Sequence, residues 1–224
     1  EHPDFGWKGD QLIKSHVYGM VNLLQIIKNN KIKKFIQIGS SSEYGKVKSP
    51  IHEKAKCQPN TPYSIAKISC TNILLNLYLN EKFPVTIFRL FQVYGPKQDK
   101  NRILPYIIKN CLENKSFKTT SGKQYSDFCY IDDVVDAIFK SLSLKETNGQ
   151  IINLGSGKPI KILNLIMLVN KLVGKGRPFI GGLKYKKGIN MKNFPSIKKA
   201  KKILNWHPKI KLNDGLKSTI KSFK

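Results

Sequence analysis

The stretch Lys34–Gly45, KFIQIGSSSEYG, indicates how the chain folds. Its first five residues form a short apolar run typical of a strand, and three serines follow after Gly39. Apolar residues at helical spacing occupy His16–Asn29 before it and Pro62–Leu79 after it. Val85–Leu90 (VTIFRL) then has the β-branched and aromatic residues of a second strand. Alternation of helix and strand predicts an α/β protein with a parallel sheet.

The pattern is looser beyond Gly95. Periodicity predicts one further short strand at Ile151–Leu154. It also predicts four further helices, at Ile103–Glu113, Asp132–Leu144, Ile162–Val173 and Ser196–Leu204. We therefore expect a loop-rich second half that interleaves with the sheet.

Composition and charge narrow the class of protein and the kind of partner. The chain has 224 residues, of which 40% are hydrophobic and 10% aromatic, enough for one substantial core and a small lobe. The net charge of +26 suggests nucleic acid as a partner, but only three of the 40 basic residues are arginine, and the lysines are spread out. Nucleic acid is therefore disfavoured, whereas a small anionic substrate fits the charge.

Cysteine spacing and hydropathy predict the compartment. The four cysteines, Cys57, Cys70, Cys111 and Cys129, lie far apart without a CxxC pair, which predicts reduced thiols and no metal site. No apolar run approaches the roughly 20 residues that span a bilayer. These features predict a cytoplasmic location with no membrane contact.

Tyr63–Lys67 reads YSIAK, and on a helix residues four apart share a face. The ammonium of Lys67 can then approach the phenol of Tyr63, and a nearby cation favours the deprotonated form of a phenol. Such a tyrosine can exchange protons with a ligand. The spacing alone also fits an aromatic residue and a solvated lysine on one helix face. The serines of Ser40–Ser42 follow a strand, where a hydroxyl can meet a ligand of an open α/β sheet or merely form a polar turn.

Six landmarks occur in one order along nearly the whole chain: IGSSSEYG, PYSIAK, RLFQVYGP, DFCYIDDVVDAI, NLGSG, and ILNWHP followed by DGL. This series resembles the extended short-chain dehydrogenase/reductase family, and within it the NAD-dependent epimerases and dehydratases of nucleotide sugars. The resemblance implies an incomplete Rossmann-like doubly wound parallel sheet with a small carboxyl-terminal α/β substrate lobe. Residues 1–95 would be the later part of the dinucleotide-binding domain. Residues 96–224 would be mainly the substrate lobe.

The resemblance also implies roles for individual residues. Tyr63 would be the general acid/base at a sugar oxygen, Lys67 would favour its deprotonated form and bind the nicotinamide ribose, and Ser40 would polarise the same oxygen. These three would carry catalysis and contact the cofactor, NAD or NADP, and we expect Ser40 and Tyr63 to lie close together. Further contacts to a nucleotide-diphosphate sugar are expected from a second set of residues: Ser41 (also the alternative to Ser40), Ser42, Gln92, Arg102 and Lys186.

The chain departs from the family pattern at its start. Members begin with a strand, a glycine-rich turn and a helix whose N-terminus binds the cofactor pyrophosphate. No GxxGxxG turn occurs in the 224 residues, and His16 stands where an asparagine usually precedes the helix beginning at Val17. We therefore expect a chain shortened at its amino end, inactive alone and weak in dinucleotide binding.

Two other departures concern the substrate. Ser126 replaces an arginine that commonly reaches the diphosphate. Ser41 and Ser42 stand at the positions of the Asp-Glu or Ser-Glu pair with which dehydratases remove water, and Glu43 lies one place further on. Dehydration is therefore disfavoured. What remains is epimerisation or reduction of a 4-keto sugar at C4, in surface-polysaccharide or deoxysugar biosynthesis.

One alternative function from another class remains open at this point. The charge and the missing glycine-rich turn suggest a non-catalytic binding module for nucleic acid or a protein. The joint presence of Ser40, Tyr63 and Lys67 argues against it, because a binding module does not need that set of residues. The resemblance also implies a homodimer formed through the helices at His16–Asn29 and Pro62–Leu79.

Overall fold

The computed structural model describes residues 7–28, 30–185 and 188–224, which form two compact units. The first unit contains the described residues up to Leu90 together with residues 136–154 and 196–206. The second contains residues 91–135, 155–195 and 207–224. Each unit is therefore assembled from segments that lie far apart in the sequence.

The first unit is built on a parallel sheet of β1 (Phe35–Ser40), β2 (Val85–Leu90) and β7 (Gln150–Leu154), in the order β1-β2-β7. The register pairs Ser40 with Leu90 and Leu90 with Leu154, so the carboxyl ends of all three strands meet at one edge. Every residue of β2 before Leu90 is buried, as expected of a central strand covered on both faces.

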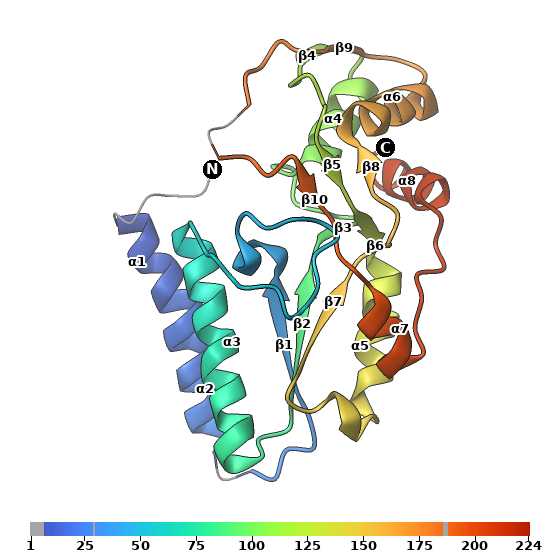
Figure 1. The fold of residues 1–224 in the computed structure, drawn as a ribbon. Helices are drawn as coiled ribbons and strands as arrows, with labels where there is room; N and C mark the ends of the chain where they lie inside the picture. Colours follow the sequence, from blue (N-terminus) through green and yellow to red (C-terminus); the bar gives the residue numbers. More distant parts are fainter. Residues whose placement is uncertain (1–6, 29, 186–187) are drawn as a thin grey trace. The chain divides into compact units, whose positions relative to one another are not determined.

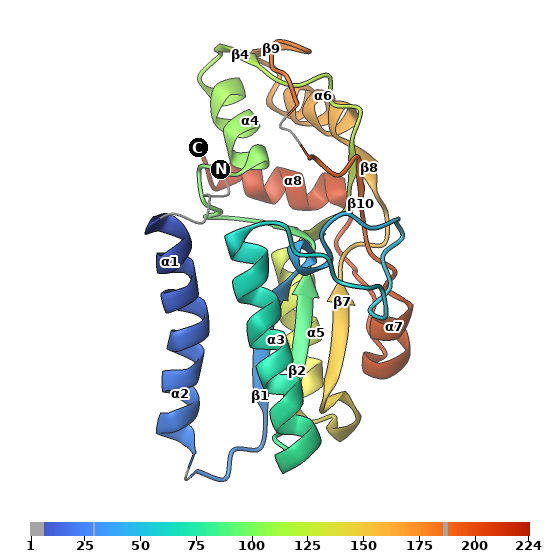
Figure 2. The same ribbon diagram turned by 60° about the vertical axis from the view of Figure 1, so that its left-hand side comes forward.

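Helices cover this sheet on both faces (Figure 1). One face carries α3 (Pro62–Glu81) beside a continuous helical rod made of α1 (Trp7–Ile13), the π-helix η1 (Lys14–Tyr18) and α2 (Gly19–Ile27). Figure 2 shows α3 against β1 and β2. On the other face lies α5 (Ile131–Leu142), of which the part from Asp136 onward belongs to this unit.

The remaining elements of the first unit are short. They are the single-turn helices η2 (Ser41–Tyr44) and η3 (Lys145–Thr147), and α7 (Lys198–Leu204) beside β7. The core between α3 and the sheet contains Met20, Cys70, Leu74, Val85 and Ile87. This arrangement confirms the predicted α/β class with a parallel sheet and helices on both faces.

The second unit combines helices with very short strands. The helices are α4 (Ile103–Leu112), α6 (Ile162–Val173) and α8 (Leu212–Lys221). The strands pair as β3 (Gln92–Tyr94) with β6 (Phe128–Tyr130), as β4 (Ser116–Lys118) with β9 (Arg177–Phe179), and as a three-stranded sheet in the order β10 (Lys192–Asn193), β5 (Tyr125–Ser126), β8 (Ile160–Lys161). Its core includes Leu104, Ile108, Phe128, Leu165 and Leu216.

The helix predicted at His16–Asn29 begins earlier and changes its hydrogen-bond pattern. It starts at Trp7 and passes through five residues of π-helix before α2 ends at Ile27, and Asn29 is outside the described residues. The residues before His16 include Gly9, which weakens a helical signal in the sequence. Packing of this segment against α3 stabilises the helix where the local helix propensity is low.

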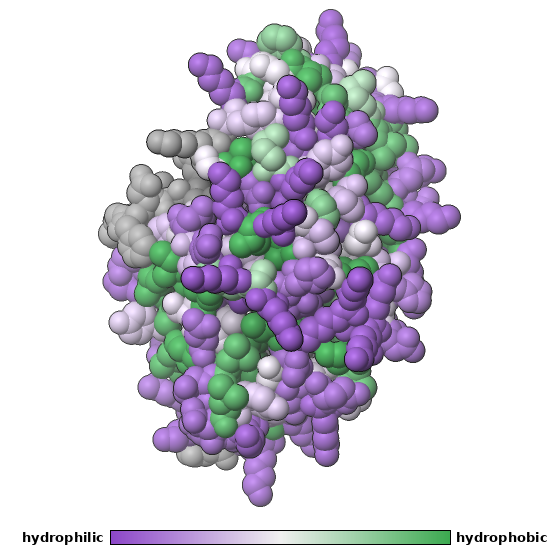
Figure 3. All heavy atoms as spheres, viewed as in Figure 1, coloured by the Kyte–Doolittle hydropathy of each residue, from purple (hydrophilic) through white to green (hydrophobic). Residues whose placement is uncertain are grey.

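Three further features bear on where the protein acts and what it contacts. The visible face in Figure 3 carries hydrophilic side chains distributed over it, with apolar ones between them. All four cysteines are free thiols. Among the described residues, no helix is long and apolar enough to cross a bilayer.

Candidate active site

Tyr63 and Lys67 lie one turn apart at the start of α3. Thr61 caps the helix: its Oγ1 accepts the N–H of Ser64 at 3.1 Å, and the Oγ of Ser64 accepts the N–H of Thr61 at 2.9 Å. Pro62 occupies the first helical position, where its missing N–H costs nothing. The helix start is thereby fixed, and Nζ of Lys67 lies 5.8 Å from the centre of the Tyr63 ring. The YSIAK motif is helical and its tyrosine and lysine are neighbours.

Lys67 ties α3 to the end of β1. Its Nζ donates a hydrogen bond of 2.9 Å to the carbonyl oxygen of Ile38, two residues before Ser40. The side chain is half-buried, and this burial lowers the pKa of Lys67, partly offset by the nearby Cys70 and Glu43. The bond to Ile38 fixes the direction of the ammonium and connects the tyrosine-bearing helix to the serine-bearing strand.

His16 contacts Tyr63 from the neighbouring helix. The two rings meet edge to face, with centroids 5.5 Å apart and planes at 74°. The backbone oxygen of His16 accepts the thiol of Cys70 at 3.4 Å, which holds the π-helical turn against α3. Burial, and then the charge of Lys67, lower the pKa of His16, so its neutral form is favoured. From the sequence, His16 was noted only because it replaces the asparagine common in the family, and its contact with Tyr63 was not predicted.

Ser40 is the last residue of β1 and the N-cap of η2. Its Oγ accepts the N–H of Ser42 at 3.2 Å and the hydroxyl of Ser42 at 2.9 Å. Its own N–H donates to Oε1 of Glu43 at 2.8 Å. Ser40 and Ser42 are thus in direct contact, and Ser41 is the half-buried first residue of η2. The proximity of Ser40 to Tyr63 stays a prediction.

Glu43 is the centre of a buried polar cluster behind Ser40. Its Oε2 accepts Nε of Arg89 on β2 at 2.8 Å and Oγ1 of Thr71 on α3 at 2.9 Å. Glu43 is fully buried and Arg89 is 2% exposed. The carboxylate therefore joins β1, η2, α3 and β2 at the sheet edge where Ser40 lies. Sequence reasoning compared Glu43 only with dehydratase acids and gave Arg89 no role.

Tyr44 extends this cluster toward β7. The guanidinium of Arg89 lies 4.4 Å from the centre of the Tyr44 ring, and the Tyr44 hydroxyl donates to Oδ1 of Asn153 at 2.7 Å. Burial is the main cause that raises the pKa of Tyr44 to about 12. Tyr44 is therefore a neutral, packed residue, and the EYG landmark anchors the loop after β1.

Two landmarks far apart in the sequence meet in the second unit. Asp127 of DFCYIDD accepts the N–H of Ser156 in the NLGSG segment. Asp127 is fully buried, and this burial raises the pKa of its carboxyl group against the opposing hydrogen bonds. Its role here is to hold the loop after β7. The adjacent Ser126, which stands where an arginine is common, pairs in β5 with Asn193 and Ile160.

Comparison with known protein families identifies the family of this chain. The model of the NAD dependent epimerase/dehydratase family matches residues 6–155, a segment that includes Ser40, Glu43, Tyr63 and Lys67. The chain belongs to this family. The resemblance drawn from the six landmarks is thereby confirmed.

Relatives within the epimerase/dehydratase family act on nucleotide sugars. A UDP-glucuronate 4-epimerase of Thermodesulfobacterium geofontis is 34% identical over 213 residues, which are 93% of this chain and 64% of the relative. A human dTDP-D-glucose 4,6-dehydratase is 27% identical over 216 residues, or 93% of this chain and 61% of the relative. The chain thus spans less than two thirds of the length of these curated relatives.

Solved members of the family share the fold. The UDP-glucose 4-epimerase of Thermotoga maritima, solved with UDP-glucose, superposes with a TM-score of 0.90 at 28% identity, over 96% of this chain and 71% of that one. A UDP-glucuronic acid 4-epimerase of Bacillus cereus, solved with UDP-glucuronic acid and NAD, gives 0.87 at 30% identity, over 94% and 67%. The predicted cofactor, NAD or NADP, is that of the family, which is NAD-dependent by its description.

Gln92 and Arg102, also predicted to bind substrate, belong to a different unit from Tyr63. Gln92 is half-buried on β3, and Arg102 is exposed directly before α4. Both belong to the second unit. Lys186 falls outside the described residues. Their contacts with a nucleotide sugar stay predictions, as do those of Ser41 and Ser42.

Proposed function

We propose that the protein containing this chain is an NAD(P)-dependent enzyme that oxidises and re-reduces C4 of a nucleotide-diphosphate sugar. The observation that carries the proposal is the fixed pair on α3: Lys67 bonds Ile38 at 2.9 Å and holds its ammonium 5.8 Å from the ring centre of Tyr63. In its deprotonated form the Tyr63 oxygen is a base that can accept the proton of a bound sugar hydroxyl.

The cofactor fits the donors present. Lys67 offers an ammonium and Tyr63 a hydroxyl on one helix face, and such groups suit the hydroxyls of a nicotinamide ribose. We infer that Tyr63, Lys67 and Ser40 would hold that part of the cofactor. When bound, the nicotinamide supplies and accepts the hydride.

In this proposal Tyr63 accepts and returns the proton of the C4 hydroxyl. As C4 loses hydride, the phenolate oxygen of Tyr63 takes the proton of the C4 hydroxyl, leaving a ketone. When hydride returns to C4, Tyr63 returns the proton to the ketone oxygen, and the sugar hydroxyl is restored. Ser40 donates a hydrogen bond to the same oxygen. One residue thus acts as base and acid in turn.

Four-epimerisation is the outcome we favour, because relatives at 30% and 34% identity are named as 4-epimerases of UDP-glucuronate. Reduction of a 4-keto sugar uses the same residues and is the second candidate. Dehydration is disfavoured: Ser42, at a position of the dehydratase acids, donates to Ser40, and Glu43 is bound to Arg89 in the buried cluster.

The full-length protein tests these outcomes. Incubation with NAD and UDP-glucuronate or UDP-glucose, followed by proton NMR of the sugar, should show inversion at C4. A reductase would instead consume NADPH stoichiometrically with a 4-keto nucleotide sugar, and a dehydratase would release water to give a 4-keto-6-deoxy sugar. Absence of all three reactions over a panel of nucleotide sugars would leave the binding-module alternative. A steep loss of oligonucleotide affinity with salt would then support that alternative.

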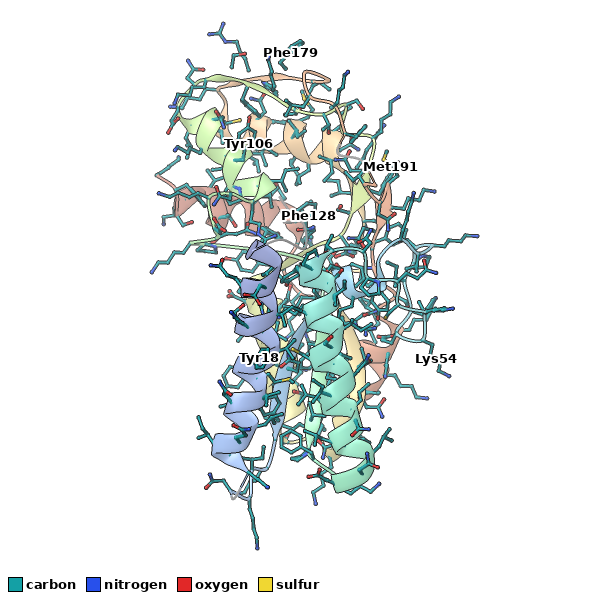
Figure 4. All side chains as sticks on the ribbon, turned by 90° about the vertical axis from the view of Figure 1, so that its left-hand side faces the viewer. Tyr18, Lys54, Tyr106, Phe128, Phe179 and Met191 are labelled. Carbon is teal, nitrogen blue, oxygen red and sulfur yellow. The ribbon has the colours of Figure 1, made fainter. Side chains whose placement is uncertain are left out.

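A homodimer is also part of the proposal. The helical rod exposes apolar side chains on one stretch, with Tyr18 61%, Leu23 46% and Ile26 74% exposed. Tyr18 lies on the side of the rod turned toward the viewer in Figure 4. Leu79, near the end of the adjacent α3, is 66% exposed. A second copy pairing helix to helix would bury these side chains.

A further inference from the structure

The hydrogen bonds of Ser40 restrict what its hydroxyl can do. Its Oγ accepts two hydrogen bonds from one residue, the N–H of Ser42 at 3.2 Å and the hydroxyl of Ser42 at 2.9 Å. A serine hydroxyl has two acceptor lone pairs and one hydrogen to donate. With both lone pairs occupied, Ser40 can engage a further partner only as a donor.

The backbone of Ser40 is held as firmly as its side chain. Its N–H donates to Oε1 of Glu43 at 2.8 Å, and the other oxygen of Glu43 is fixed by Arg89 and Thr71. Gly39 makes this possible, because a Cβ there would stand 2.6 Å from Oε1 of Glu43 and 3.2 Å from the carbonyl oxygen of Phe88. Glycine at this position admits the carboxylate that sets the Ser40 backbone.

We propose that Ser42 and Glu43 are positioning residues that preset Ser40 as a one-way hydrogen-bond donor to the reacting oxygen of the substrate. This inference rests on the proposed function. The ligand group it selects is an acceptor, such as a keto oxygen or the oxygen of a hydroxyl whose own hydrogen points elsewhere. Ser40 then cannot take a proton from the sugar hydroxyl, and that hydrogen is directed to Tyr63. The arrangement assigns donor and base to different residues.

Capping alone does not account for the arrangement. An N-cap serine needs only to accept backbone N–H groups, which Ser42 and Glu43 supply, and the Glu43 side chain completes the capping box by accepting the Ser40 N–H. The second bond, from the Ser42 hydroxyl, adds nothing to the cap. Its effect is to make Ser40 the acceptor in this contact, which leaves the hydroxyl hydrogen of Ser40 for a further partner. Removal of the Ser42 hydroxyl therefore separates the two roles, because the cap stays intact.

A double-mutant cycle in the full-length enzyme tests the proposal. Ser42→Ala should lower kcat about tenfold, the effect of one hydrogen bond, with KM for the nucleotide sugar within about twofold and Tm nearly unchanged. Ser42→Thr, which keeps the hydroxyl, should restore most of the rate. In a Ser40→Ala background Ser42→Ala should have no further effect, because it acts through Ser40. Ser143→Ala, at an exposed serine beyond α5, is the matched control.

Other outcomes of these measurements would overturn either this inference or the proposed function. An equal loss from Ser42→Ala with and without Ser40 would show a merely structural role and overturn the inference, as would a normal kcat in Ser42→Ala. If Ser42→Ala fails to fold, Ser42→Cys, a weak donor of similar size, takes its place in the cycle. Full activity in both Tyr63→Phe and Ser40→Ala would overturn the proposed function itself. If Tyr63→Phe and Ser40→Ala lose activity while the Ser42 variants keep a normal kcat, this inference is overturned and the proposed function stands.

Discussion

The carboxylate of Glu43 and the guanidinium of Arg89 form an ion pair with 2.8 Å between Oε2 and Nε, and neither side chain is more than 3% exposed. The pair joins η2 to β2 directly behind Ser40, and Thr71 extends it to α3. A buried ion pair stabilises a fold little compared with apolar packing of the same volume, yet removal of one partner leaves a buried charge uncompensated. The bond from the Ser40 N–H to the same carboxylate supports a positioning role beside the candidate site.

Removal of the Glu43 charge should therefore destabilise the first unit strongly. Glu43→Gln is expected to lower the free energy of unfolding by about 3–5 kcal/mol, because Arg89 stays buried without a counter-charge. Urea denaturation of the 224-residue chain measures this. Glu113→Gln, at a surface ion pair with Lys115, is the control and should change stability little. Arg89→Met added to Glu43→Gln should recover part of the loss, and a further loss would contradict the explanation.

Tyr63 should be required for chemistry and dispensable for folding. In the full-length enzyme, Tyr63→Phe is expected to lower kcat by about 10² to 10⁴, the usual contribution of general acid/base catalysis, with substrate affinity preserved. Tyr18→Phe, at an exposed tyrosine on η1, should leave kcat unchanged. Steady-state kinetics with the sugar substrate identified by NMR supply the comparison. Near-normal turnover by Tyr63→Phe would return YSIAK to the interpretation of an aromatic and a lysine on a solvated face.

Acid should destabilise the chain through His16. The folded-state pKa of His16 is lowered from 6.5, so between that lowered value and 6.5 the unfolded chain binds more protons than the folded chain. Stability is therefore lost as pH falls below 6.5. His16→Gln should lose less stability than the native chain between pH 7.5 and pH 5.5, measured by urea denaturation at both values. His207→Gln, at an exposed histidine, should behave as the native chain does, and equal acid sensitivity of His16→Gln would refute the prediction.

The exposed apolar stretch of the helical rod should control association. Ile26→Lys is expected to shift the chain from dimer to monomer in light-scattering chromatography, because the 74% exposed Ile26 would be buried against a second copy. Ile210→Lys, at an exposed isoleucine of the second unit, should leave the molecular mass unchanged. A monomeric native chain, or a dimer that tolerates Ile26→Lys, would rule out this interface.

The 224-residue chain alone should bind NAD weakly. No glycine-rich turn of GxxGxxG type occurs in it, and that turn with its helix N-terminus normally supplies the N–H groups for the pyrophosphate. Calorimetry should give a Kd of about 1 mM or weaker. The full-length protein should bind tightly under the same conditions. Micromolar binding by the 224-residue chain would show that other residues hold the pyrophosphate.

The sequence by itself determined the features that depend on neighbours along the chain. Helical periodicity located α3 from its first residue, and the β-branched run Val85–Leu90 has the bounds of β2. The spacing of Tyr63 and Lys67 placed them on one helix face because i and i+4 always share it. The order of landmarks identified the family. Strands of two or three residues, such as β5 and β8, escaped notice because so few residues cannot display a period.

Only the tertiary structure decided which polar side chains meet. Glu43 finds Thr71 and Arg89 at sequence separations of 28 and 46 residues, and Lys67 finds Ile38 at 29. Periodicity shows that a residue is buried, but not which partner satisfies its charge, since that depends on how strands and helices cross at the sheet edge. His16 reaches Tyr63 for the same reason: two helices distant in the sequence pack side by side. The pairing of buried polar groups is a property of the packing, because each must find a partner wherever the folded chain supplies one.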